Sequence, residues 1–128
     1  MTTPSPISAF NNQLLNFIED LTQSYPEETD LKRALDSLQG LRKLNPKIIH
    51  TAFMEYIYPE FHGPVKAEDE TALITKANTI LNGEYKDYAF AYIIFHKHWS
   101  TMSEPNKKAI WKWCKVIVAL AERAATPM

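Results

Sequence analysis

The stretch SEPNKKAIWKWCKVIVALAER, residues 103–123, decides the fold. Ser103 is a suitable helix cap, Glu104 suits the positive end of a helix dipole, and Pro105 fits the first turn. Apolar side chains then recur at steps of three and four residues, the pattern of one buried helix face: Ile110, Trp113, Cys114, Ile117, Leu120 and Ala121. Lysines occupy the opposite face. The stretch predicts an amphipathic helix packed on other helices.

Stripes of the same kind occur earlier in the chain. Apolar residues repeat at helical spacing within residues 10–21, 31–41, 49–57 and 73–81. Asn45-Pro46 predicts the start of the third helix, with Asn45 as N-cap and Pro46 at the first helical position. These patterns predict helices that can only bury their stripes against one another.

Two segments differ from this pattern. Residues 84–99 are apolar nearly all round, which predicts a central helix; a buried strand is the rival interpretation. Between Tyr58 and Val65 two prolines and a glycine interrupt the chain, and we interpret this run as an ordered crossover loop in which Phe61 and Val65 are buried.

Composition limits the fold class. The chain has 128 residues, of which 45% are hydrophobic and 23% charged, with 3 Gly, 1 Cys and a net charge of −1. These values fit one soluble domain without a disulfide framework, and no apolar run is long enough to span a bilayer. We predict an all-α, single compact, non-repeating bundle of five to seven helices in residues 8–123, between a flexible tail at 1–7 and a C-terminal tail at 124–128. A soluble protein of a reducing compartment is expected.

Three groups of residues suggest chemistry, and each has a simpler interpretation. On a helix, the rings of His96 and His98 point about 200° apart, so they cannot share a metal ion. Cys114 lies on an apolar stripe, where a thiol is inert. The acidic run 68–70 suits a helix start better than a calcium site. The sequence predicts no catalytic residue, metal or cofactor, and therefore no enzyme.

A basic segment supports one binding hypothesis. Residues 97–115 hold five lysines and one acidic residue, interleaved with three tryptophans. Lysines with aromatic rings can follow a phosphate backbone and stack on bases. A nucleic-acid-associated regulator acting through Lys107, Lys108, Lys112 and Lys115 is the alternative function, although a solvated helix face explains the same lysines.

A second hypothesis rests on Trp111. This residue falls outside the predicted stripe, beside Val118 one heptad further on. A Trp–Val ridge next to a lysine face fits a partner-binding anchor, because tryptophan is enriched at interface hot spots. The ridge fits equally well as packing under the Pro59–Val65 loop, and both interpretations stay open here. Trp113, on the stripe, is predicted to be core.

The chain resembles a known group of proteins at FNNQLLNFIEDLTQSYP (10–26), NPK (45–47) and WSTMSEPNK (99–107) leading into IWK (110–112). It is similar to small helical proteins of nucleocytoplasmic large DNA viruses of algae and protists. The resemblance implies a viral origin, a location in the host cytoplasm or the virion, and a non-enzymatic accessory or virion-associated role. Together with the absence of a catalytic motif, it favours a protein–protein interaction module whose partner is a viral or host protein.

Overall fold

The computed structural model describes residues 5–81 and 97–125, and every element in them is helical. The predicted all-α bundle is confirmed. The elements are α1 (Pro6–Ser24), α2 (Thr29–Leu44), α3 (Ile48–Ala52), the π-helical turn η1 (Phe53–Ile57), α4 (Tyr58–Ala67), α5 (Glu70–Leu81), the 3-10 turn η4 (Trp99–Thr101) and α7 (Glu104–Ala125). Residues 84–96 of the segment 84–99, predicted as a helix or a strand, lie outside the described residues.

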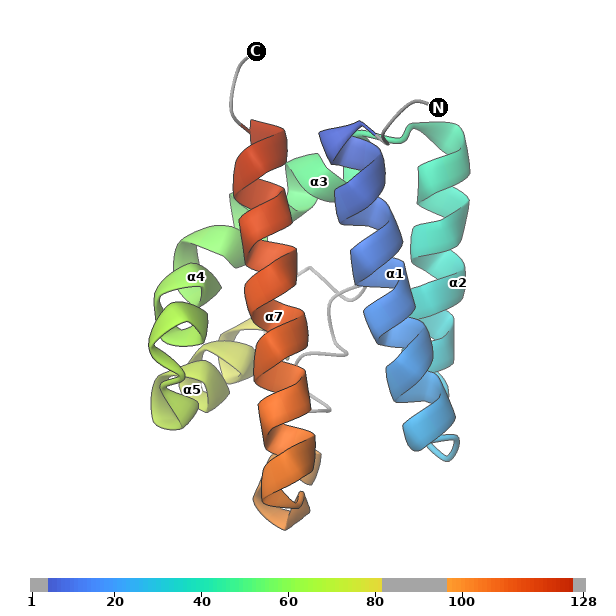
Figure 1. Cartoon of the computed structure of the whole chain (residues 1–128). Helices are drawn as coiled ribbons and strands as arrows, with labels where there is room; N and C mark the ends of the chain where they lie inside the picture. Colours follow the sequence, from blue (N-terminus) through green and yellow to red (C-terminus); the bar gives the residue numbers. More distant parts are fainter. Residues whose placement is uncertain (1–4, 82–96, 126–128) are drawn as a thin grey trace.

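Three long helices stand side by side, with α1 between α2 and α7 (Figure 1). α1 runs antiparallel to both neighbours. α3 and η1 cross one end of this layer, and α4 and α5 pack on the side of α7 that faces away from α2 (Figure 1). α7 is therefore held between α1 and the α4–α5 pair.

α1 supplies the centre of the core. Phe10, Leu14 and Ile18, spaced by four residues, are almost fully buried. Phe10 meets the rings of His50 and Phe53 edge-on, with ring centroids 5.1 Å apart in both pairs. The four-residue spacing read from the sequence therefore identifies the core-facing side of this helix.

The first and last helices reach slightly beyond residues 8 and 123, the limits predicted for the helical domain. The Oγ atom of Ser5 accepts a hydrogen bond from the Ser8 amide at 3.1 Å, and α1 begins at Pro6, inside the predicted tail. α7 extends to Ala125, two residues beyond the predicted end of the domain at residue 123. A capping serine followed by proline explains the early start.

The helix α3 begins later than predicted. Asn45 ends α2, and its Oδ1 accepts the Lys47 amide at 3.0 Å, while α3 begins at Ile48. Asn45 thus forms a local turn and does not cap α3. The fully buried Asn11 of α1 donates from Nδ2 to the Pro46 carbonyl at 2.8 Å, which fixes this turn on the bundle.

The predicted crossover loop between Tyr58 and Val65 is wrong, because this run is the helix α4. The Tyr58 amide donates to the Phe53 carbonyl, an i to i−5 bond that widens the turn just before Pro59. Pro59 then occupies the first turn of α4, where its missing N–H is tolerated. Ile57, Phe61 and Val65 are buried at four-residue steps, as the helix requires.

α4 ends at Glu68, which adopts the left-handed conformation with φ 52°. The Asp69 amide donates to the Pro64 carbonyl at 2.9 Å, and Asp69 Oδ1 accepts the Ala72 amide at 3.1 Å. The acidic run therefore closes one helix and caps the next, in agreement with its predicted role at the start of α5.

α7 begins as predicted but buries a different stripe. Ser103 Oγ accepts the Asn106 amide at 3.3 Å, and Pro105 lies in the first turn. The buried residues of α7 are Ile110, Trp111, Ile117, Val118 and Ala121, whereas Trp113 and Leu120 are partly buried. Relative to the predicted stripe, the buried stripe of α7 is rotated toward Trp111. The reason is that α4 and η4 cover the flank with Trp111, while α1 covers the other side.

Candidate functional site

The predicted anchor residues Trp111 and Val118 do not form an exposed ridge. They are only 6% and 4% exposed, and the Trp111 ring meets the buried Trp99 ring edge-on at 5.3 Å. Of the two interpretations left open for Trp111, its burial fits packing inside the bundle and not an exposed anchor. Periodicity along one helix could not decide between them, because it does not show how many neighbours that helix has. The binding role given to this pair therefore lacks an exposed surface.

Trp113, predicted to be core, lies at the other flank of α7. Its ring stacks on Phe17 of α1 with centroids 5.5 Å apart, and the residue keeps part of its surface exposed. A hollow of about 300 Å³ opens beside it, lined by Gln13, Ala109, Lys112, Trp113 and Val116. We call this hollow, which lies along the seam between the two helices, the α1–α7 groove.

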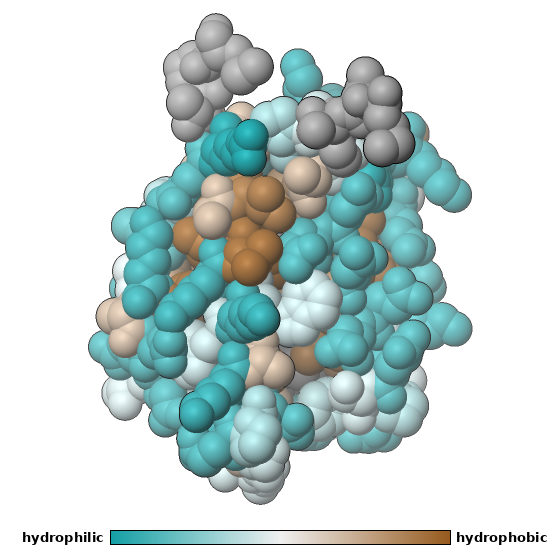
Figure 2. Space-filling model, in the orientation of Figure 1, coloured by the Kyte–Doolittle hydropathy of each residue, from teal (hydrophilic) through white to brown (hydrophobic). Residues whose placement is uncertain are grey.

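The α1–α7 groove is bordered by apolar surface. Val116 is 38% exposed, and Leu120, one turn further, is partly buried. Figure 2 shows an apolar patch on the face that carries α7 and α1, surrounded by hydrophilic side chains. A second hollow, of about 80 Å³, shares Ala109 and Trp113 with the groove and extends it toward Tyr25.

The four predicted lysines divide into two kinds. Lys107 is largely buried: its Nζ lies 3.6 Å from Glu70 and 5.4 Å from the centre of the Trp99 ring. Lys115 forms an ion pair with Glu68. Lys108 and Lys112 are exposed and have no ion pair within residues 5–81 and 97–125. The charge that the lysines offer to a ligand is therefore smaller than the sequence suggests.

Lys108, Lys112 and Lys115 nevertheless share one side of α7, the lysine face. Counting about 100° per residue, they span about 60° of the helix circumference, and Val116, Ala109 and Trp113 span the next sector. A further hollow of about 360 Å³ has all three lysines and Val116 among its lining residues. The lysine face and the apolar edge of the α1–α7 groove thus meet at Lys112 and Val116.

A small, partly open cavity lies between α1, α4 and α7. It has a volume of about 60 Å³, and its walls are apolar among the described residues, with Phe17, Phe61 and Val118 contributing from the three helices. Cys114 lines it, and burial raises the pKa of the thiol to about 12. The thiol is therefore protonated at neutral pH, which agrees with the predicted inert core role.

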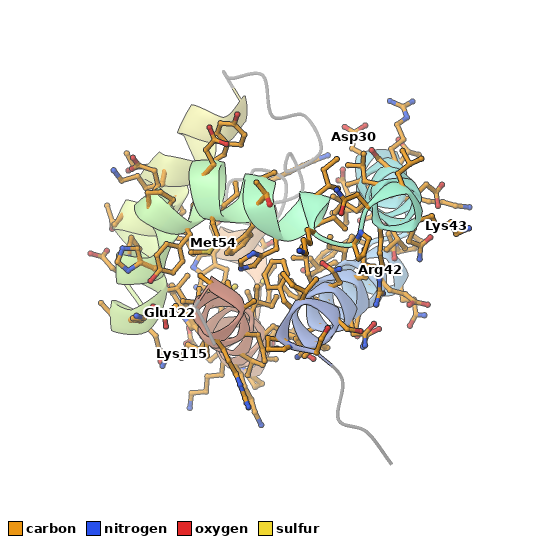
Figure 3. All side chains as sticks on the ribbon, turned by 90° about the horizontal axis from the view of Figure 1, so that it is seen from above. Asp30, Arg42, Lys43, Met54, Lys115 and Glu122 are labelled. Atoms are coloured by element: carbon orange, nitrogen blue, oxygen red, sulfur yellow. The ribbon has the colours of Figure 1, made fainter. Side chains whose placement is uncertain are left out.

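Polar contacts join α4 to α7. Tyr58 donates a hydrogen bond to the carboxylate of Glu122, and Lys66 Nζ lies 2.6 Å from the same oxygen. Hydrogen bonds from Lys66 and Tyr58 hold the pKa of Glu122 below its ordinary value. Glu122 and Lys115 lie on the same side of α7, toward α4 (Figure 3).

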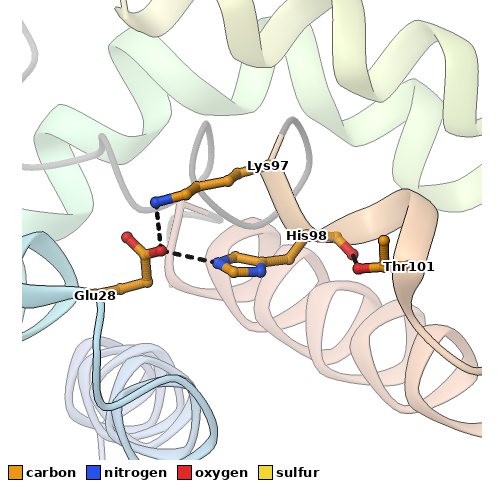
Figure 4. A network of polar contacts seen from close by, with 4 residues as sticks. All are labelled: Glu28, Lys97, His98 and Thr101. Carbon is orange, nitrogen blue, oxygen red and sulfur yellow. Dashed lines mark hydrogen bonds and ion pairs between the residues drawn. The ribbon is translucent and has the colours of Figure 1, made fainter.

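A further polar cluster, absent from the sequence-based prediction, lies at the turn between α1 and α2. Lys97 Nζ and His98 Nε2 both contact Oε1 of Glu28, at 2.6 and 3.1 Å (Figure 4). The hydrogen bond from Lys97 is the main reason why the pKa of Glu28 is lowered. Seventy residues separate Glu28 from His98, so spacing along the chain gives no signal of this contact.

Comparison with known proteins identifies no relative: no family model, curated protein or solved structure matches the chain. The resemblance to proteins of large DNA viruses, and the viral role it implies, therefore stay predictions. Among the described residues, no helix combines the length and apolar character needed to cross a membrane.

Proposed function

We propose that this chain is a protein–protein interaction module whose α1–α7 groove binds an amphipathic helix with acidic residues along one flank. The observation that carries the proposal is the meeting of an exposed apolar edge with the lysine face at Val116 and Lys112. An amphipathic helix binds a groove through apolar residues spaced at i, i+3, i+4 and i+7. Acidic residues beside that stripe would meet the lysines, which favours both orientation and association rate.

Trp113 supports this interpretation. Its indole is held by the stack on Phe17, so little side-chain freedom is lost when a partner covers its exposed edge. Tryptophan in such a position is a frequent hot spot of protein interfaces. Trp113 therefore takes the anchor role that the sequence suggested for Trp111.

The nucleic-acid alternative has weaker support. Lys107 and Lys115 are ion-paired with carboxylates, which competes with phosphate binding. Two of the three tryptophans are buried, and Phe17 covers one face of the third, so little ring surface is left for stacking on successive bases.

Selection from a displayed library of helical peptides tests the proposal. The library carries a fixed apolar stripe and randomised flanks, and the bait is the full chain. We expect enriched peptides to carry Asp and Glu beside the stripe. We expect their affinity to fall about tenfold or more with Val116→Asp, the scale of a hot-spot substitution. Lys112→Glu is expected to weaken the binding of peptides with acidic flanks and to shift the preference toward basic flanks.

Two matched variants serve as controls. Leu44 is 81% exposed and lies at the end of α2, so Leu44→Asp repeats the apolar-to-acidic change far from the groove. Lys43→Glu repeats the charge reversal on α2 (Figure 3). Peptides that bind Val116→Asp as well as wild type would contradict the proposal. Binding to duplex DNA that weakens steeply with salt and is lost in Lys112→Glu would favour the alternative function.

A further inference from the structure

Three potential metal ligands meet where α1 turns into α2, close to the end of the bundle that lies opposite α3. Glu27 and Glu28 come from the turn, and His98 comes from the segment just before η4. One ligand atom from each residue lies within 4.8 Å of the other two. This cluster is separate from the lysine face and from the edge of the groove marked by Val116, and the proposed function does not use it.

Two of the three ligands are already fixed in place. The side chain of Glu28 is only 10% exposed, and that of His98 is 17% exposed. The imidazole stacks on Tyr25 with ring centroids 4.3 Å apart, which directs Nε2 to Glu28 Oε1 (Figure 4). A preorganised pair of ligands reduces the entropy lost on binding. Glu27 is exposed, so its carboxylate has the freedom to turn toward the other two.

The cluster already holds a cation. Lys97 Nζ lies 2.6 Å from Glu28, yet the lysine side chain is 59% exposed. An exposed ammonium group is readily rehydrated when it leaves its partner, and a divalent cation bound in its place keeps a positive charge beside the Glu28 carboxylate. Lys97 thus occupies a position that a more strongly bound cation can take.

The geometry points to a site for a divalent transition-metal ion of the Zn²⁺ type, bound by Glu27, Glu28 and His98 in place of the Lys97 ammonium group. One imidazole nitrogen with two carboxylate oxygens is a ligand set that Zn²⁺ accepts, and three protein ligands leave a fourth position for water. Bonds of about 2.0–2.2 Å place the ligand atoms of a tetrahedral ion about 3.4 Å apart. His98 Nε2 and Glu28 Oε1, 3.1 Å apart, are already near this spacing, and the exposed Glu27 has the freedom to supply the third ligand atom. Ca²⁺ and Mg²⁺ prefer more oxygen ligands and are not expected to bind.

Calorimetric titration of the full chain with ZnCl₂ at neutral pH tests the site. We expect saturable binding of one ion, weakened about tenfold or more by His98→Ala and by Glu27→Gln, in line with the usual effect of losing groups that hold a metal. Lys97→Met removes the competing cation and is expected to tighten binding several-fold. This increase distinguishes a metal site from a purely structural ion-pair cluster.

His62→Ala is the matched control. The His62 ring stacks on Tyr58 at 4.5 Å, much as His98 stacks on Tyr25, but His62 does not belong to the Glu27–Glu28–His98 cluster. Three results would overturn the inference. The wild type does not bind Zn²⁺, binding survives both His98→Ala and Glu27→Gln, or His62→Ala loses binding to the same extent as His98→Ala. Weaker binding in Lys97→Met would also overturn it. Because Glu27 is exposed, Glu27→Gln keeps the test valid even where His98→Ala loses its fold.

Discussion

The two flanks of α7 differ in what covers them. On one flank Trp111 and Val118 are buried, with Trp111 against Trp99, and polar contacts from Lys115 and Glu122 tie the helix to the α4 region. On the other flank Trp113 stacks on α1 but stays partly exposed beside Val116. Two tryptophans two residues apart on one helix thus have different surroundings, one closed and one partly open, and the proposed binding role rests on the open one.

The largest expected effect comes from Trp111→Ala. Removing this buried indole leaves a cavity beside Trp99 and should lower the free energy of unfolding by about 3–5 kcal/mol. Chemical denaturation with urea measures the loss. If Trp111→Ala lowered the free energy of unfolding less than Trp113→Ala does, the flank of α7 toward α4 would not be the flank that stabilises the fold.

Trp113→Ala is expected to have a smaller effect on folding. The variant loses the stack on Phe17 and part of the buried area, about 1–2 kcal/mol, because the ring is already partly in water. The same variant should abolish measurable binding of peptides selected on the α1–α7 groove. Retained peptide affinity together with a large loss of stability would reverse the roles of the two flanks.

Glu68 tests the backbone on the flank toward α4. Glu68→Gly and Glu68→Ala both remove the ion pair with Lys115, but only glycine adopts the left-handed φ of 52° without steric cost. We expect the glycine variant to be more stable than the alanine variant by about 1 kcal/mol. Equal melting temperatures for the two variants would show that the end of α4 rearranges.

The smallest effect is a pH dependence from Glu122. Its pKa is lowered in the folded chain by Lys66 and Tyr58, so its contribution to stability is fully present above the ordinary pKa of 4.5. That contribution is lost as the pH falls below 4.5 and through the lowered value. Urea titrations between neutral and acidic pH should show a shallower loss in Glu122→Gln than in wild type. Identical slopes would mean that Glu122 does not contribute to the acid sensitivity.

Periodicity predicted the helices and their core faces where one helix meets one partner. Phe10, Leu14 and Ile18 illustrate this in α1. It did not predict α4, because the prolines at 59 and 64 suggest a break unless the neighbouring π-helical turn is known. It also left Trp111 outside the main stripe and could not decide whether this residue was buried, since a stripe in the sequence does not reveal a second neighbour.

The site residues were predicted less well than the helices. The lysine face follows from spacing along α7, but the ion pairs that occupy Lys107 and Lys115 join residues far apart in the chain. The same is true of Glu28 and His98, which meet only after α1, α2 and η4 have packed. Contacts of this kind depend on the tertiary structure and have no local pattern.

The pairing of α1 with α7 has a consequence for the folding rate. These helices open and close the described chain, they contact each other extensively, and the start of α1 lies near the end of α7 (Figure 1). Loop closure over almost the whole chain slows folding relative to bundles whose neighbours follow in sequence. Joining the two ends with a short linker and opening the chain in the α2–α3 turn should therefore give a circular permutant that reaches the same bundle by a faster route.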